Sequence, residues 1–166
     1  MKKTISFFLA FLFIFLSAPS IFAEHNIALN GQSTTEIIYL DNGGYITITL
    51  VVDDLPSLSR SSSKSASYTR FGEKSVASND ASGNLEWEYT LFGEFFVVEG
   101  VSAVCTNASY SENIYKSGWS FSDGDATQSG NTAYGVGTFK KKVLFITVDT
   151  VNIDVQLSCD INGNLS

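Results

Sequence analysis

The strongest constraint in this sequence is a strict two-residue alternation close to its end. Between residues 151 and 160, apolar and polar residues alternate without interruption. One side carries Val151, Ile153, Val155, Leu157 and Cys159, and the other carries Asn152, Asp154, Gln156, Ser158 and Asp160. Successive side chains of a β-strand point to opposite faces, so this pattern predicts a strand with one buried and one solvated face. Such a strand requires a second layer to cover its apolar side.

Residues 1–23 have the layout of a secretory signal peptide. Two lysines precede an apolar run from Ile5 to Leu16, and Ala23 offers a small residue at a cleavage point before Glu24. The run is too short to cross a hydrocarbon layer of about 30 Å. The sequence therefore predicts a protein that is secreted to the extracellular space and begins at Glu24. An uncleaved membrane anchor is the alternative.

The charge of the chain restricts its partners. The formal net charge is −7 at pH 7, and removal of the signal peptide takes away two lysines and no acidic residue. Nucleic acids and anionic lipids are bound by clustered Lys and Arg side chains. We therefore expect no nucleic-acid partner, and no membrane association once the signal peptide has been removed.

The chain has two cysteines, Cys105 and Cys159. Export favours oxidation of paired thiols, and both residues fall on inward positions of predicted strands, so the sequence predicts one disulfide between them. In the chain-entropy model such a bridge stabilises the fold by about 4 kcal/mol. Two free thiols packed as small apolar side chains are the alternative.

Short strand patterns separated by turn residues fill the rest of the chain. Residues 24–56 predict a lead-in and a hairpin, residues 57–67 a serine-rich loop, and residues 68–166 the body of the same domain. No stretch shows sustained helical spacing of apolar residues. We therefore expect an all-β fold, an antiparallel β-sandwich of the immunoglobulin-like kind with one disulfide. A small β-barrel is the alternative.

Three finer features of the body are also predicted. Residues 113–122 form a strand, residues 123–125 a turn, and residues 126–139 a strand that is rich in small residues. The small residues that share one face of this last strand are Ala133, Gly135 and Gly137. We expect Trp87 or Trp119 to fill the room that they leave.

The residues offer little catalytic chemistry. The only histidine after the signal peptide is His25, close to the predicted new N-terminus, where a catalytic histidine would be poorly held. Glu86 and Glu88 have strand spacing that would place two carboxylates about 7 Å apart on one face, as a glycoside hydrolase requires. A solvated outer face explains the same spacing. We predict a protein that is not an enzyme and has no cofactor and no metal site.

Several aromatic residues lack an obvious place in the core. They are Tyr110, Tyr115, Trp119 and Tyr134. An exposed stripe of such side chains would favour ligand binding. The sequence therefore predicts a secreted, non-enzymatic binding module for an extracellular glycan or protein. A carboxylate-dependent glycoside hydrolase and a structural or inhibitory extracellular protein are the alternatives.

Five stretches of the chain also resemble a known family. They are residues 87–95, the Cys105-Thr106 step, Ser117-Gly118-Trp119, residues 129–133 and residues 157–166. In order and spacing they are similar to a family of small secreted proteins of Gram-positive, largely gut-dwelling bacteria, catalogued as a domain of unknown function. The resemblance implies export, the cysteine pair and an all-β body, and it implies no catalytic residues.

Overall fold

The structure is a computed structural model that describes residues 32–53 and 66–166. The predicted signal peptide with its cleavage point between Ala23 and Glu24, most of the lead-in, and most of the serine-rich loop lie outside the described residues. The described residues contain eight strands.

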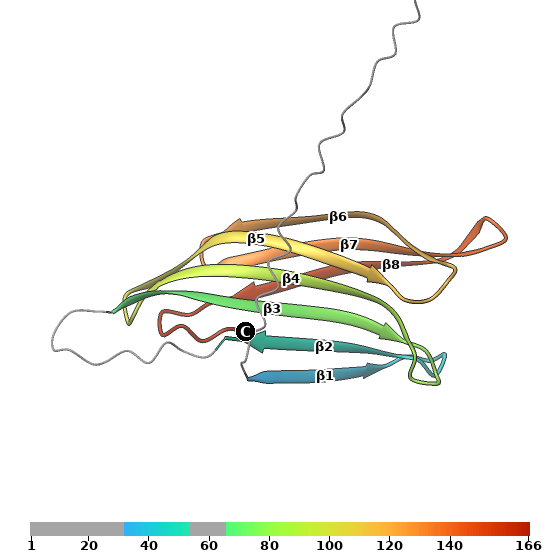
Figure 1. Ribbon diagram of the computed structural model, residues 1–166, viewed down its shortest axis with the longest axis horizontal. Coiled ribbons are helices and arrows are strands. Elements are labelled where there is room, and N and C mark those ends of the chain that lie inside the picture. The colour runs from blue at the N-terminus through green and yellow to red at the C-terminus, as the bar shows by residue number, and fades with distance from the viewer. Residues whose placement is uncertain (1–31, 54–65) are drawn as a thin grey trace, which may run out of the picture.

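The strands form two antiparallel sheets that pack face to face (Figure 1). The larger sheet has the order β1 to β5, with β1 at Ser33–Tyr39, β2 at Tyr45–Val52, β3 at Ser67–Asn79, β4 at Leu85–Val98 and β5 at Ser102–Ile114. The smaller sheet has β6 at Trp119–Ser129, β7 at Thr132–Val143 and β8 at Ile146–Ser158. The predicted β-sandwich is confirmed, and the barrel alternative is wrong because the two sheets stay separate.

Each sheet is a meander in chain order. Immunoglobulin domains connect their strands as Greek keys, so the likeness to them lies in the packing of two sheets. The predicted β1–β2 hairpin is confirmed. Gly43 in its turn has a φ of 83°, and the Gly43 N–H donates a 3.0 Å hydrogen bond to the Leu40 carbonyl oxygen. Glycine adopts such a left-handed conformation without steric cost.

Strand β8 has the two faces that the alternation predicts. Ile153, Val155 and Leu157 are buried, and the intervening Asp154 and Gln156 are exposed. The buried side faces β3 and β4 of the larger sheet, so β8 forms part of the wall of the core.

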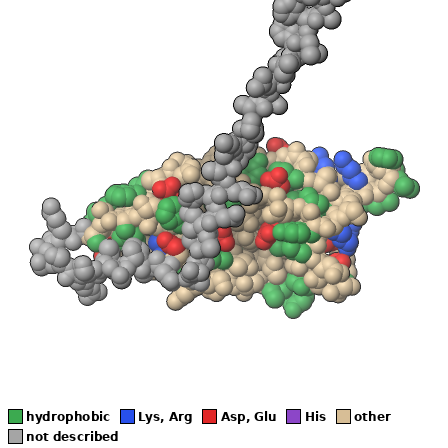
Figure 2. Space-filling view, viewed as in Figure 1, with side chains coloured by type: hydrophobic (Ala, Val, Ile, Leu, Met, Phe, Trp, Pro, Cys, Tyr) green, Lys and Arg blue, Asp and Glu red, His purple; other side chains and the backbone are tan. Residues whose placement is uncertain are grey.

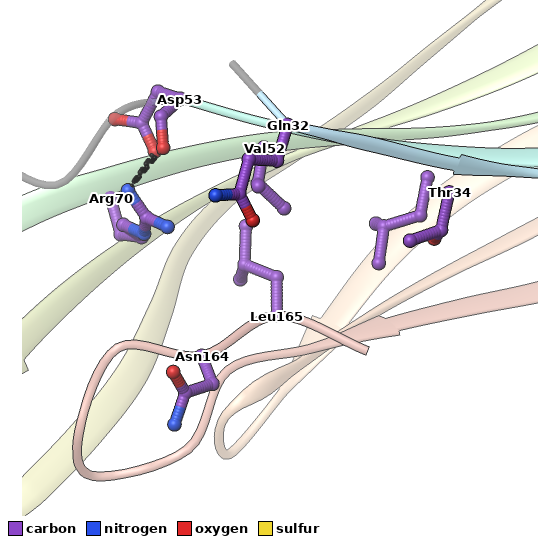
Figure 3. Close-up of a pocket in the computed structure, with 8 residues that line it drawn as sticks. Gln32, Thr34, Val52, Asp53, Arg70, Asn164 and Leu165 are labelled. Carbon is purple, nitrogen blue, oxygen red and sulfur yellow. Dashed lines mark hydrogen bonds and ion pairs between the residues drawn. The ribbon is translucent and has the colours of Figure 1, made fainter.

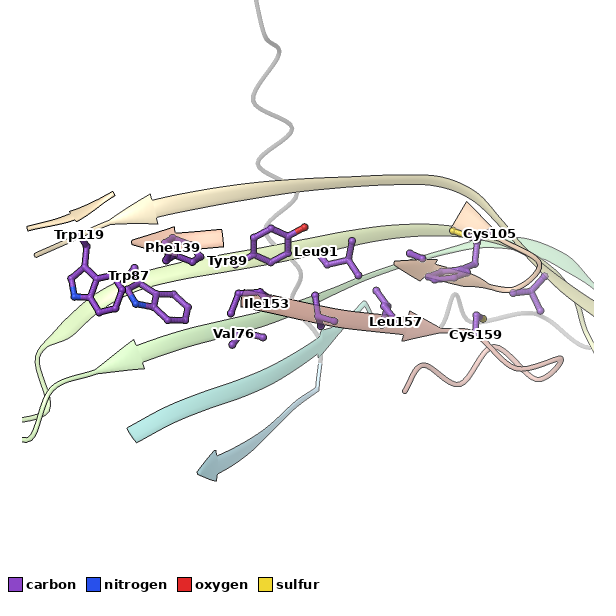
Figure 4. Packing of buried hydrophobic residues seen from close by; sticks show 14 residues of the cluster. Val76, Trp87, Tyr89, Leu91, Cys105, Trp119, Phe139, Ile153, Leu157 and Cys159 are labelled. Atoms are coloured by element: carbon purple, nitrogen blue, oxygen red, sulfur yellow. The ribbon is translucent and has the colours of Figure 1, made fainter. Parts of the chain in front are cut away.

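Strand β4 supplies the largest side chains of the core (Figure 4). Trp87, Tyr89 and Leu91 alternate on its inner face and have no exposed surface. The Trp87 ring stacks on Phe139 of β7 with ring centroids 4.2 Å apart, and the Trp119 ring meets Trp87 edge-on at 6.0 Å. Burying side chains of this size stabilises the fold by about 1.5–3 kcal/mol each.

The small-residue face of β7 is filled by a different aromatic ring from the one expected. A β-carbon built on Gly135 would lie 2.7 Å from the Tyr89 hydroxyl oxygen, and one on Gly137 would lie 3.0 Å from the Tyr89 ring. The prediction of Trp87 or Trp119 at this place is therefore wrong. Both tryptophans lie nearer the end of the sandwich, next to Phe139.

The predicted disulfide is also wrong, because Cys105 and Cys159 are both free and buried. The Cys105 thiol donates to the Asn107 carbonyl oxygen at 3.3 Å, and the Cys159 thiol donates to the Asp160 carbonyl oxygen at 3.5 Å. Each sulfur is thus held by its own stretch of backbone. Burial raises the pKa of Cys159 to about 11, which disfavours the reactive thiolate.

Three predicted boundaries in the body differ from the structure. Strand β5 ends at Ile114 and β6 begins at Trp119, so residues 113–122 span a turn. Residues 123–125 lie inside β6, where the register shifts between Phe121 and Asp123 and the Phe121 ring covers Gly124. Residues 126–139 are divided by the β6–β7 turn, in which Gly130 has a φ of 60°.

Candidate functional site

The four aromatic residues predicted to bind a ligand do not form one surface. Trp119 is buried against Trp87, and its ring is part of the core. Tyr110 stacks on Tyr89 with centroids 5.4 Å apart and donates to the Gly124 carbonyl oxygen at 3.2 Å.

Tyr115 and Tyr134 are the other two members of this set, and only Tyr115 is exposed. Tyr115 is 54 % exposed in the turn after β5, and its hydroxyl donates to Glu88 at 3.2 Å. Tyr134 is half-buried near the start of β7, opposite Gln156 of β8. Tyr115 lies in the turn between the two sheets and Tyr134 lies in the smaller sheet, so the four residues do not form the expected stripe.

Glu86 and Glu88 do not share a face. The register of β3 and β4 shifts between Ser78 and Asn79, which leaves Glu86 as an extra residue on β4. The bulge turns the Glu86 side chain toward the face of Trp87, where it accepts a 3.3 Å hydrogen bond from the Ser78 hydroxyl. Glu88 lies on the outer face with Tyr115. The prediction of two carboxylates on one face is therefore wrong.

Glu86 is the buried centre of an ion cluster whose lysines are partly exposed. Its Oε1 accepts from the Lys116 ammonium at 2.9 Å, and the same Lys116 bonds Asp80 at 3.0 Å. Burial alone would raise the pKa of Glu86, but the hydrogen bond from Lys116 and the charges of Lys116 and Lys141 outweigh it and lower the pKa. A glycosidase acid needs a raised pKa, so this geometry does not support the hydrolase alternative.

A cavity of about 290 Å³ opens at the other end of the sandwich (Figure 3). Its lining comes from β1, β2, β3 and the C-terminal turn: Gln32, Thr34, Leu50, Val52, Asp53, Arg70, Asn164 and Leu165. The buried Arg70 guanidinium forms an ion pair of 2.7 Å with Asp53 and donates to the Gly163 carbonyl oxygen at 3.0 Å. These bonds tie β2 and β3 to the C-terminal turn, so the charged groups of the cavity are engaged in holding the fold together.

The feature that stands out on the surface is the tip of the β7–β8 hairpin (Figures 1 and 2). Five exposed apolar side chains gather there: Val143, Leu144, Phe145, Ile146 and Val148. We call this set the apolar tip. Leu144 is 85 % exposed and Phe145 is 99 % exposed. Monomeric proteins expose single apolar side chains routinely, but a contiguous group marks an interaction site or an aggregation hazard.

The loop that forms the apolar tip has an unfavourable backbone. Val143 pairs with Ile146, so Leu144 and Phe145 are the two loop residues, and their φ angles are 47° and 69°. Two-residue hairpin loops with positive φ at both positions favour Asn-Gly, because side chains with a β-carbon are strained there. Strain of this kind is concentrated at functional sites.

This turn is not predicted by the sequence. The sequence predicts residues 143–148 as a stretch of strand before the closing strand, because Leu144 and Phe145 carry no turn signal. The one available clue was an unbroken apolar run, Val143 to Ile146, directly after three lysines. A half-buried strand should instead alternate apolar and polar residues at this length.

Three lysines lie at the base of the apolar tip, in β7. Lys141 is partly engaged by the body, because its ammonium lies 5.4 Å above the Trp119 ring and 3.9 Å from Glu86. Within residues 32–53 and 66–166, no ion pair involves Lys140 or Lys142. Figure 2 shows basic side chains between the apolar tip and the body of the molecule.

No protein-family model, curated protein or solved structure matches the chain. The resemblance to secreted Gram-positive proteins therefore stays a prediction. Among the described residues there is no helix with the length and apolarity to cross a membrane.

Proposed function

We propose that this protein is an exported, non-enzymatic binding module that attaches to another surface through the apolar tip of its β7–β8 hairpin. The observation that carries the proposal is the near-complete exposure of two adjacent large side chains, Leu144 and Phe145, in a strained loop. Neither side chain contributes to the core, and Asn-Gly would serve the turn better. Their identity is therefore explained by what they contact outside the molecule.

The energetics of the apolar tip suit docking. Burying a Leu, Val, Ile or Phe side chain contributes about 1.5–3 kcal/mol. Four such residues, Val143 to Ile146, are adjacent on one hairpin. Association costs at least about 4 kcal/mol in lost freedom, and a paired hairpin adds little ordering cost because its shape is already set. The apolar tip therefore has enough surface to support binding without a large flat interface.

The chemistry of the apolar tip selects among partners. Its five side chains contain no hydrogen-bond donor or acceptor. Sugars present many hydroxyl groups that need such partners when they are desolvated. A glycan is therefore a poor match, and an apolar partner surface is a good one. The glycan half of the sequence-based expectation receives no support from this surface.

Binding to whole cells tests the proposal. Purified protein beginning at Glu24 is mixed with intact cells of the producing species and sedimented, and the bound fraction is measured by immunoblot. The double variant L144N/F145G replaces the loop by a favourable turn without touching the core. Val101→Ser, at an exposed turn in another part of the fold, is the matched control.

We expect the wild type and the Val101→Ser variant to bind equally, and the double variant to lose at least nine-tenths of its binding. Equal binding by the double variant and the wild type would show that another surface makes the contact. Failure of the wild type to bind would reject attachment to these cells altogether.

A further inference from the structure

Resting on the function proposed above, we infer that the surface bound by the apolar tip is a phospholipid bilayer, into whose interfacial region Leu144 and Phe145 insert while Lys140 and Lys142 of β7 meet the lipid phosphates. Two alternatives, an apolar groove on a protein and self-association of two copies, are outcomes of the test below.

The apolar tip is exposed on every side. Val143 and Ile146 pair across the hairpin, Leu144 and Phe145 cap its end, and Val148 lies at the register shift near its base. A protein groove contacts one face of a hairpin and leaves the other face exposed to solvent, whereas a bilayer surrounds an inserted segment on all sides. An end whose two loop residues and adjoining pair are all apolar and exposed therefore fits a bilayer better than a groove.

The backbone of the hairpin permits shallow insertion. The Val143–Ile146 and Lys142–Thr147 pairs lie within the hairpin itself. In a bilayer, backbone N–H and C=O groups that lack a partner are strongly disfavoured. Only the two loop residues lie beyond the last paired position. The expected depth is therefore that of the headgroup boundary, which is where short apolar anchors lie.

The positions of the lysines match the layers of a bilayer interface. Lys140, Lys141 and Lys142 immediately precede the apolar run. Lysine side chains extend their ammonium groups toward lipid headgroups while their alkyl stems lie along apolar surface. An inserted apolar tip would thus bring Lys140 and Lys142 to the phosphate level.

The acidic net charge of the chain does not oppose this arrangement. At physiological ionic strength, charges are screened over about 8 Å, so the bilayer senses the hairpin more strongly than the body. The hairpin from Lys140 to Thr150 has three lysines and a single acidic residue, Asp149, which is opposite Lys141. The expectation of no membrane partner was drawn from the net charge, and our inference departs from it because the local charge of the hairpin is positive.

Vesicle flotation tests the inference. Purified protein beginning at Glu24 is floated with vesicles of phosphatidylcholine and with vesicles of phosphatidylcholine mixed with phosphatidylglycerol. We expect the wild type to bind both, and the mixed vesicles more tightly. The L144N/F145G variant should partition at least tenfold more weakly onto both kinds of vesicle. The K140Q/K142Q variant should partition more weakly onto the mixed vesicles alone, by about fivefold for each lysine replaced. Val101→Ser should bind as the wild type does, and circular dichroism checks that each variant is folded.

A depth measurement provides a second, independent readout. In an F145W variant, brominated acyl chains should quench the added indole fluorescence, relative to the wild-type background of Trp87 and Trp119, which are buried. Absence of additional quenching on bound vesicles would overturn the inference, as would wild-type vesicle binding that L144N/F145G does not weaken.

The vesicle and cell experiments separate the inference from the function on which it rests. If L144N/F145G abolishes cell binding but the wild type does not bind vesicles, the lipid inference is overturned and the docking function stands. If treatment of the cells with trypsin abolished wild-type binding, the partner would be a surface protein. The lipid inference would then be overturned and the docking function would stand. If the wild type sediments as a dimer that L144N/F145G converts to a monomer, self-association replaces the bilayer.

Discussion

Leu144 and Phe145 are consecutive residues that both have a left-handed backbone, and together they form the whole loop between β7 and β8. A left-handed conformation costs a residue with a β-carbon roughly 1–2 kcal/mol. The side chains that would relieve this strain are small and polar, and those present are large and apolar. Stability and the proposed attachment function therefore favour different residues at the same two positions.

This conflict predicts that L144N/F145G is more stable than the wild type. The gain should be about 1–3 kcal/mol in the free energy of unfolding, because Asn-Gly adopts the turn without strain and no core contact is lost. Urea unfolding measures it. The control L144A/F145A removes the apolar side chains but keeps two β-carbons in the loop, so it should gain much less. A double variant that is no more stable than this control would contradict the strain argument.

The packing of Gly135 beneath Tyr89 gives a second prediction. Gly135→Ala should destabilise the fold by about 1–3 kcal/mol, because the added β-carbon would lie 2.7 Å from the Tyr89 hydroxyl oxygen and 3.1 Å from Leu91. The Tyr89 hydroxyl also donates to the Asp125 carbonyl oxygen at 3.1 Å, which limits its freedom to move.

A double-mutant cycle isolates that contact. Tyr89→Phe alone should cost about 1 kcal/mol for the lost hydrogen bond. In the Tyr89→Phe background, Gly135→Ala should cost less than it does in the wild type, because the nearest atom is gone. Additive effects of the two substitutions would mean that Gly135 is required for a reason other than contact with this hydroxyl.

The ion cluster around Glu86 predicts how the stability of the fold depends on acid. The pKa of Glu86 is lower in the folded protein than its ordinary value of 4.5. Its carboxylate therefore contributes stability that is complete above about pH 4.5 and is lost as the pH falls through the folded-state pKa. Glu86→Gln should cost about 1–3 kcal/mol at neutral pH and should lose less stability than the wild type on acidification.

Unfolding in urea at about pH 7 and about pH 3 measures both effects. The pKa of Asp80 is lowered by the hydrogen bond from Lys116, so Asp80 should leave the Glu86→Gln variant with part of the acid sensitivity of the wild type. Glu88→Gln, on the outer face, is the matched control and should stay within about 0.5 kcal/mol of the wild type at neutral pH. The ion cluster would not be stabilising if Glu86→Gln and Glu88→Gln behaved alike.

The two thiols give a prediction that chemical labelling checks. Without reductant, the folded protein should react slowly with a thiol reagent, because Cys105 and Cys159 are buried and burial raises the pKa of both thiols. After unfolding in denaturant, still without reductant, both should react fully. Electrophoretic mobility should be the same with and without reductant. If the unfolded chain had no reactive thiol, the result would contradict two free cysteines and support a disulfide between them.

The regular part of the fold could be predicted from the sequence. The alternation in β8 and the Asn42-Gly43 turn are local patterns, and each follows from backbone geometry alone. Both elements lie where they were expected. The partner of the Gly135 face could not be predicted, because it depends on how β4 is aligned with β7 across the two sheets.

The candidate site could not be predicted for two further reasons. The bulge at Glu86 places its carboxylate on the inner face of β4, whereas Glu88 stays on the outer face. The residues Glu86, Trp87 and Glu88 contain no pattern that predicts a bulge. The turn at Leu144 and Phe145 breaks the usual relation between turns and small polar residues. The disulfide was predicted from the number of cysteines and the expected export, whereas Cys105 and Cys159 are both free and buried in the structure.

The most direct test of the proposed docking function places a photoreactive phenylalanine analogue at position 145 and, in a separate variant, at position 101. Each protein is bound to intact cells and irradiated, and the fraction covalently attached is measured. The docking account predicts strong cross-linking from position 145 and background cross-linking from position 101. Cross-linking that is equal at the two positions, or confined to position 101, would contradict it.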